Sequence, residues 1–389
     1  MKTEHKNMTY MRVCARIHLD AMKKNVRMMQ SNLKKETKMC LVIKTDAYGH
    51  GAVITAKIFE NMEGIWGFAV AAAQEALSLR RAGIQKPVLI LGYVFPEHYP
   101  ELIREEIRMA VFDRETAAAL SEEACRQGKK ALIHLAADTG MSRIGVPDSP
   151  EGVDIACSIA ALPQVEIEGV FTHFARADER DKSNVLEAAG RFEAFLEALR
   201  QKGIVPEIRH CSNSACILEL PQLQMDMVRA GITLYGIYPS DEMDREQNVL
   251  FPAMELIIHV SYVKRVPAGT CISYGGTYRT ERETQVATIP VGYGDGYPRS
   301  LSNRGYVLID GQRCPILGRV CMDQFMVDVT GMDVKRGDEV VLMGRSKDSF
   351  LGVDEVSELS GRFPYEFVCD IGVRVPRIYI DHQDRQTTS

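Results

Sequence analysis

The 389-residue sequence contains no apolar run that approaches the roughly 20 residues needed for a membrane-spanning helix. Its first 20 residues mix charges with short apolar stretches, so they lack the continuous apolar segment of a secretory signal. Basic residues show no excess, because 47 Lys and Arg stand against 52 Asp and Glu and give a net charge of -5. These absences argue against membrane and nucleic-acid partners, and they predict a cytoplasmic protein.

The cysteines form neither a C-x-x-C pair nor a regular framework. The ten are Cys14, Cys40, Cys125, Cys157, Cys211, Cys216, Cys271, Cys314, Cys321 and Cys369. Scattered cysteines of this kind predict reduced thiols in a cytosolic protein. The histidines show neither an HExxH pattern nor a Cys/His spacing, so no metal site is indicated.

Neither disorder nor a fibrous repeat fits the composition, because 46% of the residues are hydrophobic and 25% are charged, as in ordinary globular proteins. At roughly 100 to 200 residues per domain, the length predicts two domains or one large barrel with an appendage. Either arrangement offers enough chain to bury a sizeable core.

Short β-branched runs alternate with longer helical segments in the first part of the chain, which predicts βα units and a parallel sheet. The expected strands are 39–44, 65–70, 87–93, 108–113, 131–138, 167–174, 207–212 and 226–231. The helical stretches 114–128 and 185–203 end in Gly, as a helix C-cap does. About eight strand and helix pairs are typical of a (β/α)8 TIM-type barrel, with a doubly wound sheet as the alternative.

After about residue 240 the apolar residues recur with a two-residue period, and Gly, Pro and Asp-Gly turns replace the helices. The segments are 254–266, 284–294, 305–316, 325–329 and 337–344. We therefore predict an α/β protein with an N-terminal (β/α)8 barrel over residues 14–245. A mostly antiparallel β domain follows over residues 246–389, and residues 1–13 could join it.

The sharpest local signal is VIKTDAYGHG, residues 42–51, where Lys44 ends an expected buried strand. The C-terminal ends of strands form the active-site face of a barrel, and desolvation frees a lysine amine as a nucleophile. A strand-end lysine that reaches solvent is the alternative. Tyr48 could donate its hydroxyl to an anion or simply pack in the turn.

Arg229 ends another expected strand beside Gly231, which allows close approach of a ligand to the backbone. Gly231 and Ile232 would offer main-chain N–H groups and Ser214 a hydroxyl, in loops after the last two strands. This region of a barrel frequently binds phosphate. For Ser214 a plain helix N-cap is an equal alternative, and Gly231 could be an ordinary turn residue.

Two further polar residues follow the middle strands. Arg143, just after the fifth strand, could hold a carboxylate with its guanidinium or form a surface ion pair. His173, at the end of the sixth strand, could be catalytic or a hydrogen-bonded core histidine. In the second domain, Gly-rich loops carry Tyr274 and Tyr293, while the glycines do not form the G-x-G-x-x-G pattern of a Rossmann site.

Taken in order, seven motifs resemble those of the alanine racemases that use pyridoxal 5′-phosphate (PLP). They are VIKTDAYGHG (42–51), DTGMSRIG (138–145), THFARADE (172–179), MVRAGITLYG (227–236), ISYGGTY (272–278), VGYGDGY (291–297) and CMDQ (321–324). The resemblance runs from about residue 15 to 377, nearly the whole chain. It implies a homodimer of fold type III, in which the second domain of the partner completes each active site.

The resemblance also implies roles for particular residues. Lys44 would hold PLP as a Schiff base and act as the base on one face of the substrate, with Tyr274 of the other subunit on the opposite face. Arg229 would face the pyridine nitrogen, and a guanidinium cannot hand that nitrogen a proton, so the electron sink is weakened and side reactions are limited. His173 would link Arg229 and Tyr274 through hydrogen bonds.

The remaining implied site residues fall into three groups. The phosphate would be bound by Tyr48, Ser214, Gly231 and Ile232. The substrate carboxylate would be contacted by Arg143 and Met322. The substrate entrance would be lined by Asp178, Tyr293, Arg299 and Arg319.

Two positions depart from the family pattern. Ala136 stands where many members carry a lysine whose carbamate orients the arginine that matches Arg143. Val373 stands where the family has a tyrosine that helps to close the pocket and touches the phosphate. The loss of this ring could enlarge the pocket, which keeps serine as a second candidate substrate.

The resemblance implies an amino-acid racemase that interconverts L-alanine and D-alanine by a two-base mechanism on a PLP aldimine and supplies D-alanine for cell-wall peptidoglycan. A serine or broader-specificity racemase is the alternative. The long second domain disfavours a non-enzymatic PLP carrier. A decarboxylase on the same barrel would usually place a carboxylate, rather than Arg229, at the ring nitrogen.

Overall fold

The computed structural model describes residues 12–381, and the chain divides into two compact units. The barrel unit comprises residues 21–251, and the β unit comprises the described residues 12–20 and 252–381. The sequence places the boundary between residues 245 and 246, and the division in the structure lies after Phe251.

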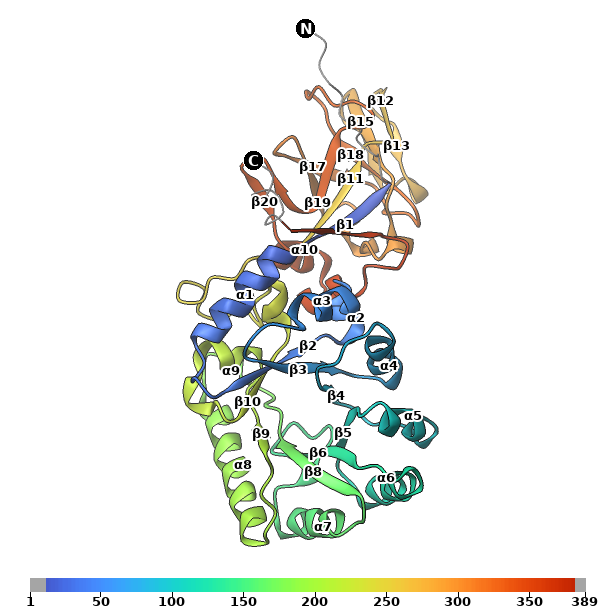
Figure 1. Ribbon diagram of the computed structural model, residues 1–389. Helices are drawn as coiled ribbons and strands as arrows, with labels where there is room; N and C mark the ends of the chain where they lie inside the picture. The colour runs from blue at the N-terminus through green and yellow to red at the C-terminus, as the bar shows by residue number, and fades with distance from the viewer. Residues whose placement is uncertain (1–11, 382–389) are drawn as a thin grey trace, which may run out of the picture. The chain divides into compact units, whose positions relative to one another are not determined.

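Parallel strands form the sheet of the barrel unit (Figure 1). They are β2 (Lys38–Val42), β3 (Ile65–Val70), β4 (Val88–Ile90), β5 (Arg108–Val111), β6 (Ala131–Asp138), β8 (Val165–Phe171), β9 (Ile208–His210) and β10 (Met227–Ala230), in the order β10-β2-β3-β4-β5-β6-β8-β9. The short strand β7 (Val146–Pro147) pairs with β6. The backbone N–H of Arg229 donates to the carbonyl of Ser212 at 2.9 Å, which nearly closes the ring between β9 and β10. The predicted (β/α)8 barrel is confirmed, and the doubly wound alternative is wrong.

Helices connect these strands and lie around the sheet (Figure 1). They are α1 (Leu19–Ser31), α2 (Lys44–Tyr48), α3 (Ala52–Phe59), α4 (Ala73–Arg81), α5 (Tyr99–Arg104), α6 (Arg114–Gln127), α7 (Pro150–Ala160), α8 (Ser183–Gln201) and α9 (Ser214–Glu219), with 3-10 turns η1 (Pro96–His98), η2 (Pro221–Leu223) and η3 (Ile232–Tyr235).

Helix α6 shows how the sequence sets these elements. The Asp113 side chain caps its first turn by accepting a hydrogen bond from the Thr116 N–H at 2.7 Å. Gly128 ends it in the left-handed conformation, as its sequence predicts. Leu120 is fully buried on the inner face of the helix.

The β unit contains a large, mostly antiparallel sheet, as predicted. Its strands are β1 (Val13–His18), β11 (Met254–His259), β12 (Tyr262–Val266), β15 (Thr284–Ile289), β16 (Tyr306–Ile309), β17 (Gln312–Leu317), β18 (Phe325–Asp328), β19 (Glu339–Ser346), β20 (Ser349–Leu351) and β21 (Arg377–Ile380). A second, two-stranded sheet consists of β13 (Cys271–Ile272) and β14 (Tyr278–Arg279).

Two features of the β unit differ from the sequence-based expectation. Strand β1 pairs with β11 and β21, so it belongs to this sheet, whereas the sequence placed the barrel from residue 14 onward. Helices α10 (Val353–Ser360) and α11 (Pro364–Cys369) follow the last segment expected from the sequence, 337–344, and neither helix was predicted. Gly361, in the left-handed conformation, ends α10.

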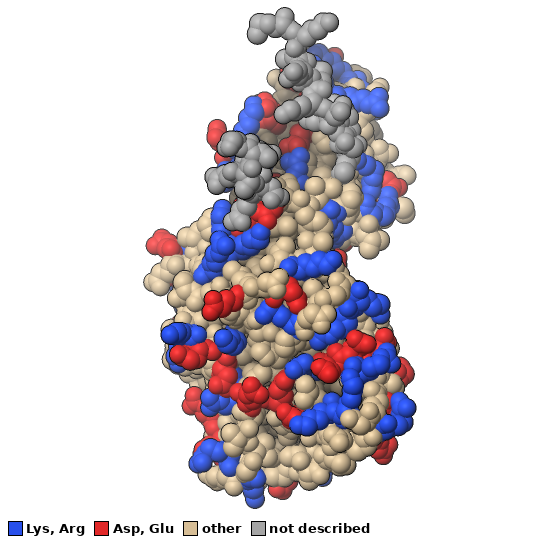
Figure 2. All heavy atoms as spheres, in the orientation of Figure 1, with Lys and Arg blue, Asp and Glu red and all other residues tan. Residues whose placement is uncertain are grey.

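The charged side chains agree with the nearly balanced composition. Figure 2 shows acidic and basic residues interspersed over the face that it displays. Within residues 12–381, no helix combines the length and apolar character that crossing a membrane would require. All ten cysteines are free thiols, as predicted.

Candidate active site

Strand β2 leads into an unusual turn that carries Lys44 and Tyr48. The strand ends at Val42, two residues earlier than predicted, and Lys44 opens the short segment α2. The φ angles of residues 45–48 are 54°, 50°, 56° and 51°, so four consecutive residues other than Gly are left-handed. Each such residue costs roughly 1–2 kcal/mol. Strain of this kind persists only where surrounding contacts hold it, and it clusters at functional sites.

Two carboxylates hold the start of this turn. Glu75 accepts hydrogen bonds from the N–H groups of Thr45 at 2.5 Å and Ala71 at 2.8 Å. The Asp46 carboxylate accepts from the N–H of Ala52 at 2.7 Å. The turn is therefore tied to the first residues of both α3 and α4.

His50 and Tyr235 hold its other end. The Nδ1–H of His50 donates to the carbonyls of Tyr48 at 2.9 Å and Ala47 at 3.1 Å, since a carbonyl can only accept. The His50 ring stacks on Tyr235 with centroids 4.5 Å apart. The Tyr235 hydroxyl donates to the Val42 carbonyl at 3.0 Å, so the turn is fixed at the end of β2.

The predicted phosphate ligands converge at the ends of β2, β9 and β10. A Cβ atom placed on Gly231 would lie 3.3 Å from the Tyr48 hydroxyl and 3.4 Å from Ser214 Oγ. The N–H of Gly231 and the hydroxyl of Thr233 both donate to Ser214 Oγ, at 2.9 and 3.0 Å. Ile232 follows directly and is 1% exposed. The hydroxyls of Tyr48 and Ser214 thus face a space that is open because Gly231 has no side chain.

Arg229 is buried near this space, with 3% of its surface exposed. Its Nη1 donates to Nδ1 of His210 at 2.8 Å and to the carbonyl of the same residue at 3.0 Å. Its Nη2 donates to the carbonyls of Thr172 at 2.7 Å and Cys211 at 3.1 Å, and to Nδ1 of His173 at 3.1 Å. The guanidinium is therefore fixed, and burial lowers its pKa from the ordinary value.

His173 lies among cations. Burial lowers the pKa of its imidazole to about 3, and three nearby positive charges add to this effect. These charges are Arg229, Arg143 and Lys44. His173 is therefore neutral, and because Arg229 donates to Nδ1, the ring proton is on Nε2.

Arg143 lies in the loop after β6 and is exposed. The Asp138 carboxylate shapes this loop by accepting hydrogen bonds from the N–H groups of Gly140 at 2.9 Å and Ser142 at 3.0 Å. Ala136 is fully buried in an apolar cluster with Ala110 and Phe171. The position of the family's lysine is thus filled by apolar packing.

In the β unit, the loops that carry the predicted site residues bind one another. Ser273, next to Tyr274, donates its hydroxyl to the Arg319 carbonyl at 2.8 Å. The N–H of Tyr293 donates to the Cys321 carbonyl at 3.1 Å. Tyr274 itself is 73% exposed.

Other predicted residues in these loops are also exposed. Met322 and Tyr293 are 52% and 44% exposed, and Val373 is fully exposed. Arg299 lies on the surface at the start of η6 (Arg299–Leu301). In the barrel unit, the carbonyl of Asp178 accepts a hydrogen bond from Ser240.

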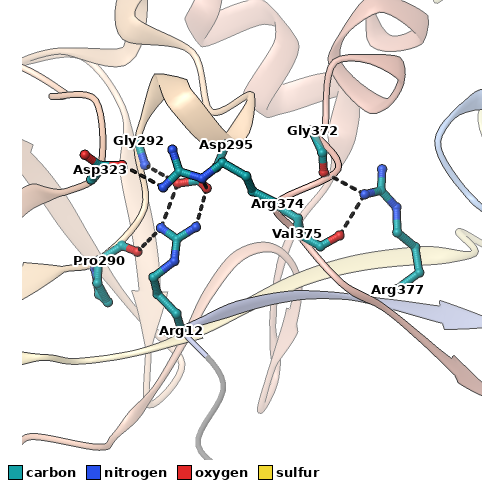
Figure 3. Close-up of polar contacts among 9 residues, drawn as sticks. All are labelled: Arg12, Pro290, Gly292, Asp295, Asp323, Gly372, Arg374, Val375 and Arg377. Atoms are coloured by element: carbon teal, nitrogen blue, oxygen red, sulfur yellow. Dashed lines mark hydrogen bonds and ion pairs between the residues drawn. The ribbon is translucent and has the colours of Figure 1, made fainter.

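A buried carboxylate connects the same loops (Figure 3). Asp295, in η5 (Tyr293–Asp295), is 1% exposed and accepts hydrogen bonds from Arg12 and from the Gly292 N–H. Arg374 pairs with Asp295 at 3.4 Å and donates to Asp323 at 2.7 Å. Arg374 follows Val373, and Asp323 follows Met322, so Asp295 and Arg374 together connect three loops.

Several residues that contact the predicted site residues were not identified from the sequence. They are His210, Thr172, Cys211, Thr233, Glu75 and His50. The only sequence signal for His210 is its place within the expected barrel strand 207–212. Among residues 12–381, no group of three or more His, Cys, Asp or Glu side chains could hold a metal ion.

Two family models match the chain: "Alanine racemase, N-terminal domain" over residues 17–239 and "Alanine racemase, C-terminal domain" over residues 253–379. A relative named alanine racemase from Desulforamulus reducens is 42% identical over 369 residues, which cover 95% of this chain and 99% of the relative. Another from Desulfovibrio desulfuricans is 46% identical over 371 residues, with 95% and 98% covered.

Solved structures agree with this result. Alanine racemase from Clostridium difficile 630 matches with a TM-score of 0.93 and 39% identity, over 96% of this chain and 97% of that one. The alanine racemase from Bacillus anthracis with bound L-Ala-P matches with a TM-score of 0.91 and 37% identity, over 96% of each chain. The resemblance predicted from the seven motifs is confirmed, and the chain belongs to the alanine racemase family.

Proposed function

We propose that this protein interconverts L-alanine and D-alanine with PLP as its cofactor, and that it supplies D-alanine for peptidoglycan. The convergence of Tyr48, Ser214 and Gly231 beside Lys44 and Arg229 carries this proposal. The relatives' names, which state alanine racemase, support the same reaction and substrate.

The barrel residues fit PLP in three places. Tyr48, Ser214 and the N–H groups of Gly231 and Ile232 would bind the phosphate, because the hydroxyls of Tyr48 and Ser214 face the open position at Gly231. Lys44 would attach the cofactor covalently through Nζ. When bound, PLP would delocalise the negative charge that develops at the substrate Cα into its ring.

Arg229 would face the pyridine nitrogen. Five hydrogen bonds to neutral acceptors keep its guanidinium in place. A guanidinium stays protonated at physiological pH even when burial lowers its pKa, so it would donate a hydrogen bond without transferring the proton. The limited electron demand of the ring would favour return of the proton to Cα over transamination or decarboxylation.

Two bases would act on opposite faces of Cα, because inversion requires removal of a proton on one side and its return on the other. We assign these roles to Lys44 and to Tyr274 of a second subunit. The exposure of Tyr274, Met322 and Tyr293 in loops that are braced together supports a partner-facing surface. The Nε2–H of neutral His173 would be the donor toward Tyr274, and Arg143 with Met322 would contact the substrate carboxylate.

The direct test is a chiral assay of the full-length protein with PLP. L-alanine should yield D-alanine until the two enantiomers are equal, and D-alanine should yield L-alanine. L-serine, tested at the same concentration, should react more slowly if the substrate is alanine. Absence of D-alanine in the presence of saturating PLP would refute the proposal.

A Gly231→Ala variant tests the phosphate site. The new methyl group would lie against the hydroxyls of Tyr48 and Ser214, so the affinity for PLP should fall by at least about tenfold. Titration of the apoprotein by absorbance measures this loss. Affinity for pyridoxal, which lacks the phosphate, should change much less.

Gly190→Ala in helix α8 is the matched control, because a Cβ there meets no atom within 4 Å. This variant should bind PLP as the wild type does. Equal losses for PLP and pyridoxal in Gly231→Ala would contradict a phosphate site at this position.

A further inference from the structure

A line of polar side chains crosses the interior of the barrel from Arg229. Nδ1 of His210 accepts from Arg229 at 2.8 Å, and Nε2 of His210 lies 2.8 Å from Nδ1 of His134. Nε2 of His134 lies 3.0 Å from the Glu168 carboxylate. Arg108 pairs with Glu168 through Nε and Nη2, at 3.1 and 3.0 Å.

The two ends of this line fix the direction of its hydrogen bonds. Arg229 can only donate, so Nδ1 of His210 must accept and Nε2 must carry the proton. At the other end, contacts with His134 and Arg108 lower the pKa of Glu168 to about 2 against the effect of burial, so its carboxylate can only accept. His134 therefore accepts on Nδ1 and donates from Nε2, and every donated proton points toward Glu168.

The barrel is built around these rings. His134 and His210 are fully buried, in a region that is usually filled by apolar side chains. A Cβ atom on Gly169 would lie 2.5 Å from Nδ1 of His134, so only glycine leaves room for the ring. Phe171 stacks on His210, with centroids 5.1 Å apart. Burial lowers the pKa of both histidines, which are therefore neutral.

The line of side chains connects Arg229 to a negative charge, which its direct hydrogen-bond partners do not provide. Within residues 12–381, its guanidinium donates to neutral imidazoles and carbonyls, although a buried cation is costly without a counter-charge. Hydrogen bonds in series polarise one another at low dielectric. The carboxylate of Glu168 thus increases the negative charge on Nδ1 of His210, next to the guanidinium.

We propose that Glu168 is a positioning residue that acts on Arg229 through His134 and His210 and sets how the guanidinium meets the pyridine nitrogen. The proposal rests on the function proposed above for the role of the ring nitrogen. The line itself is independent of it. Glu168 would serve as a remote counter-ion, placed so that no carboxylate stands beside the ring.

Glu168→Gln isolates the charge, because the amide oxygen can still accept from His134. We expect kcat to fall about tenfold while KM changes less than threefold. Glu166→Gln is the matched control, since Glu166 lies two residues earlier on β8 and forms an exposed pair with Lys130. It should retain kcat within a factor of two.

The decisive readout is nuclear magnetic resonance of the full-length protein, labelled with 15N in histidine and arginine. In the wild type, the Nε2–H protons of His134 and His210 should resonate far downfield and exchange slowly. In Glu168→Gln these signals and those of the Arg229 guanidinium should shift, whereas in Glu166→Gln they should not. Arg229→Lys assigns the guanidinium signals.

The outcomes separate the two proposals. Unchanged Arg229 signals in Glu168→Gln would overturn the proposal, as would shifted signals with unchanged kcat. If the signals shift but the protein does not racemise alanine, the coupling between Glu168 and Arg229 would stand. The proposed function would then be refuted. If Glu168→Gln does not fold, Arg108→Gln, which removes the cation that offsets the Glu168 charge, should shift the same signals in the opposite direction to that expected for Glu168→Gln.

Discussion

Lys44→Ala should abolish racemisation in both directions, with activity below ~0.1% of wild type. The substitution removes both the covalent attachment of PLP and one of the two bases. The remaining contacts at Tyr48, Ser214 and Arg229 should still bind PLP, because they do not depend on the amine. Chiral chromatography measures the activity, and absorbance shows the loss of the covalently bound form.

Two further variants serve as controls for the Lys44→Ala variant. Lys44→Arg keeps the positive charge but cannot attach the cofactor, so it should be as inactive as Lys44→Ala. Lys38→Ala, at the exposed start of the same strand, should be fully active. Borohydride treatment of the wild type should fix PLP on the peptide that contains Lys44. Attachment at another lysine, or activity in Lys44→Ala above a few per cent, would contradict the assignment.

The barrel could be predicted because each strand is a short apolar run between helical segments. The expected strand IWGFAV has the same bounds as β3, and the expected strand ALIHLAAD has the same bounds as β6. Strand β1 was assigned to the wrong unit because nothing local distinguishes it from a barrel strand. Its partners, β11 and β21, lie more than 230 residues further along the chain, and pairing at that separation leaves no local pattern.

The turn after β2 could not be predicted for a different reason. Sequence propensities place left-handed φ angles at single Gly, Asn or Asp residues, but here four consecutive residues adopt them. They are Thr45, Asp46, Ala47 and Tyr48. Tertiary contacts from Glu75 and other residues hold the turn against these propensities. Such conflicts between local preference and structure are expected at functional sites.

The site residues at strand ends could be proposed because the barrel gathers those ends on one face. Arg229, His173, Ser214 and Gly231 are examples. The line of side chains through His134, His210 and Glu168 could not be proposed from the sequence. A polar residue inside a strand is equally consistent with a solvent-facing position. Only the three-dimensional pairing shows that these residues meet inside the barrel.

Tyr274→Phe should slow racemisation in both directions by roughly 10²–10⁴-fold, because one of the two proton-transfer groups is lost. Lys44 would still remove and return a proton on its own face. In deuterated water, the variant should therefore exchange the Cα hydrogen of one enantiomer much faster than it inverts that enantiomer. Mass spectrometry after chiral separation measures both rates. Tyr278→Phe should remain active, because Tyr278 lies in the same hairpin but packs against a buried apolar cluster. This cluster consists of Val266, Ile272, Val286 and Leu317.

Mixing the two inactive variants tests whether Tyr274 acts across subunits. In a heterodimer of Lys44→Ala and Tyr274→Phe chains, shared sites would leave one site with both wild-type groups and one with neither. Random reassociation gives half heterodimers, so about a quarter of wild-type activity should return. If each chain used its own Lys44 and Tyr274, no site in the mixture would be intact and no activity would return. Undiminished turnover of Tyr274→Phe in both directions would refute the role of this tyrosine as a base.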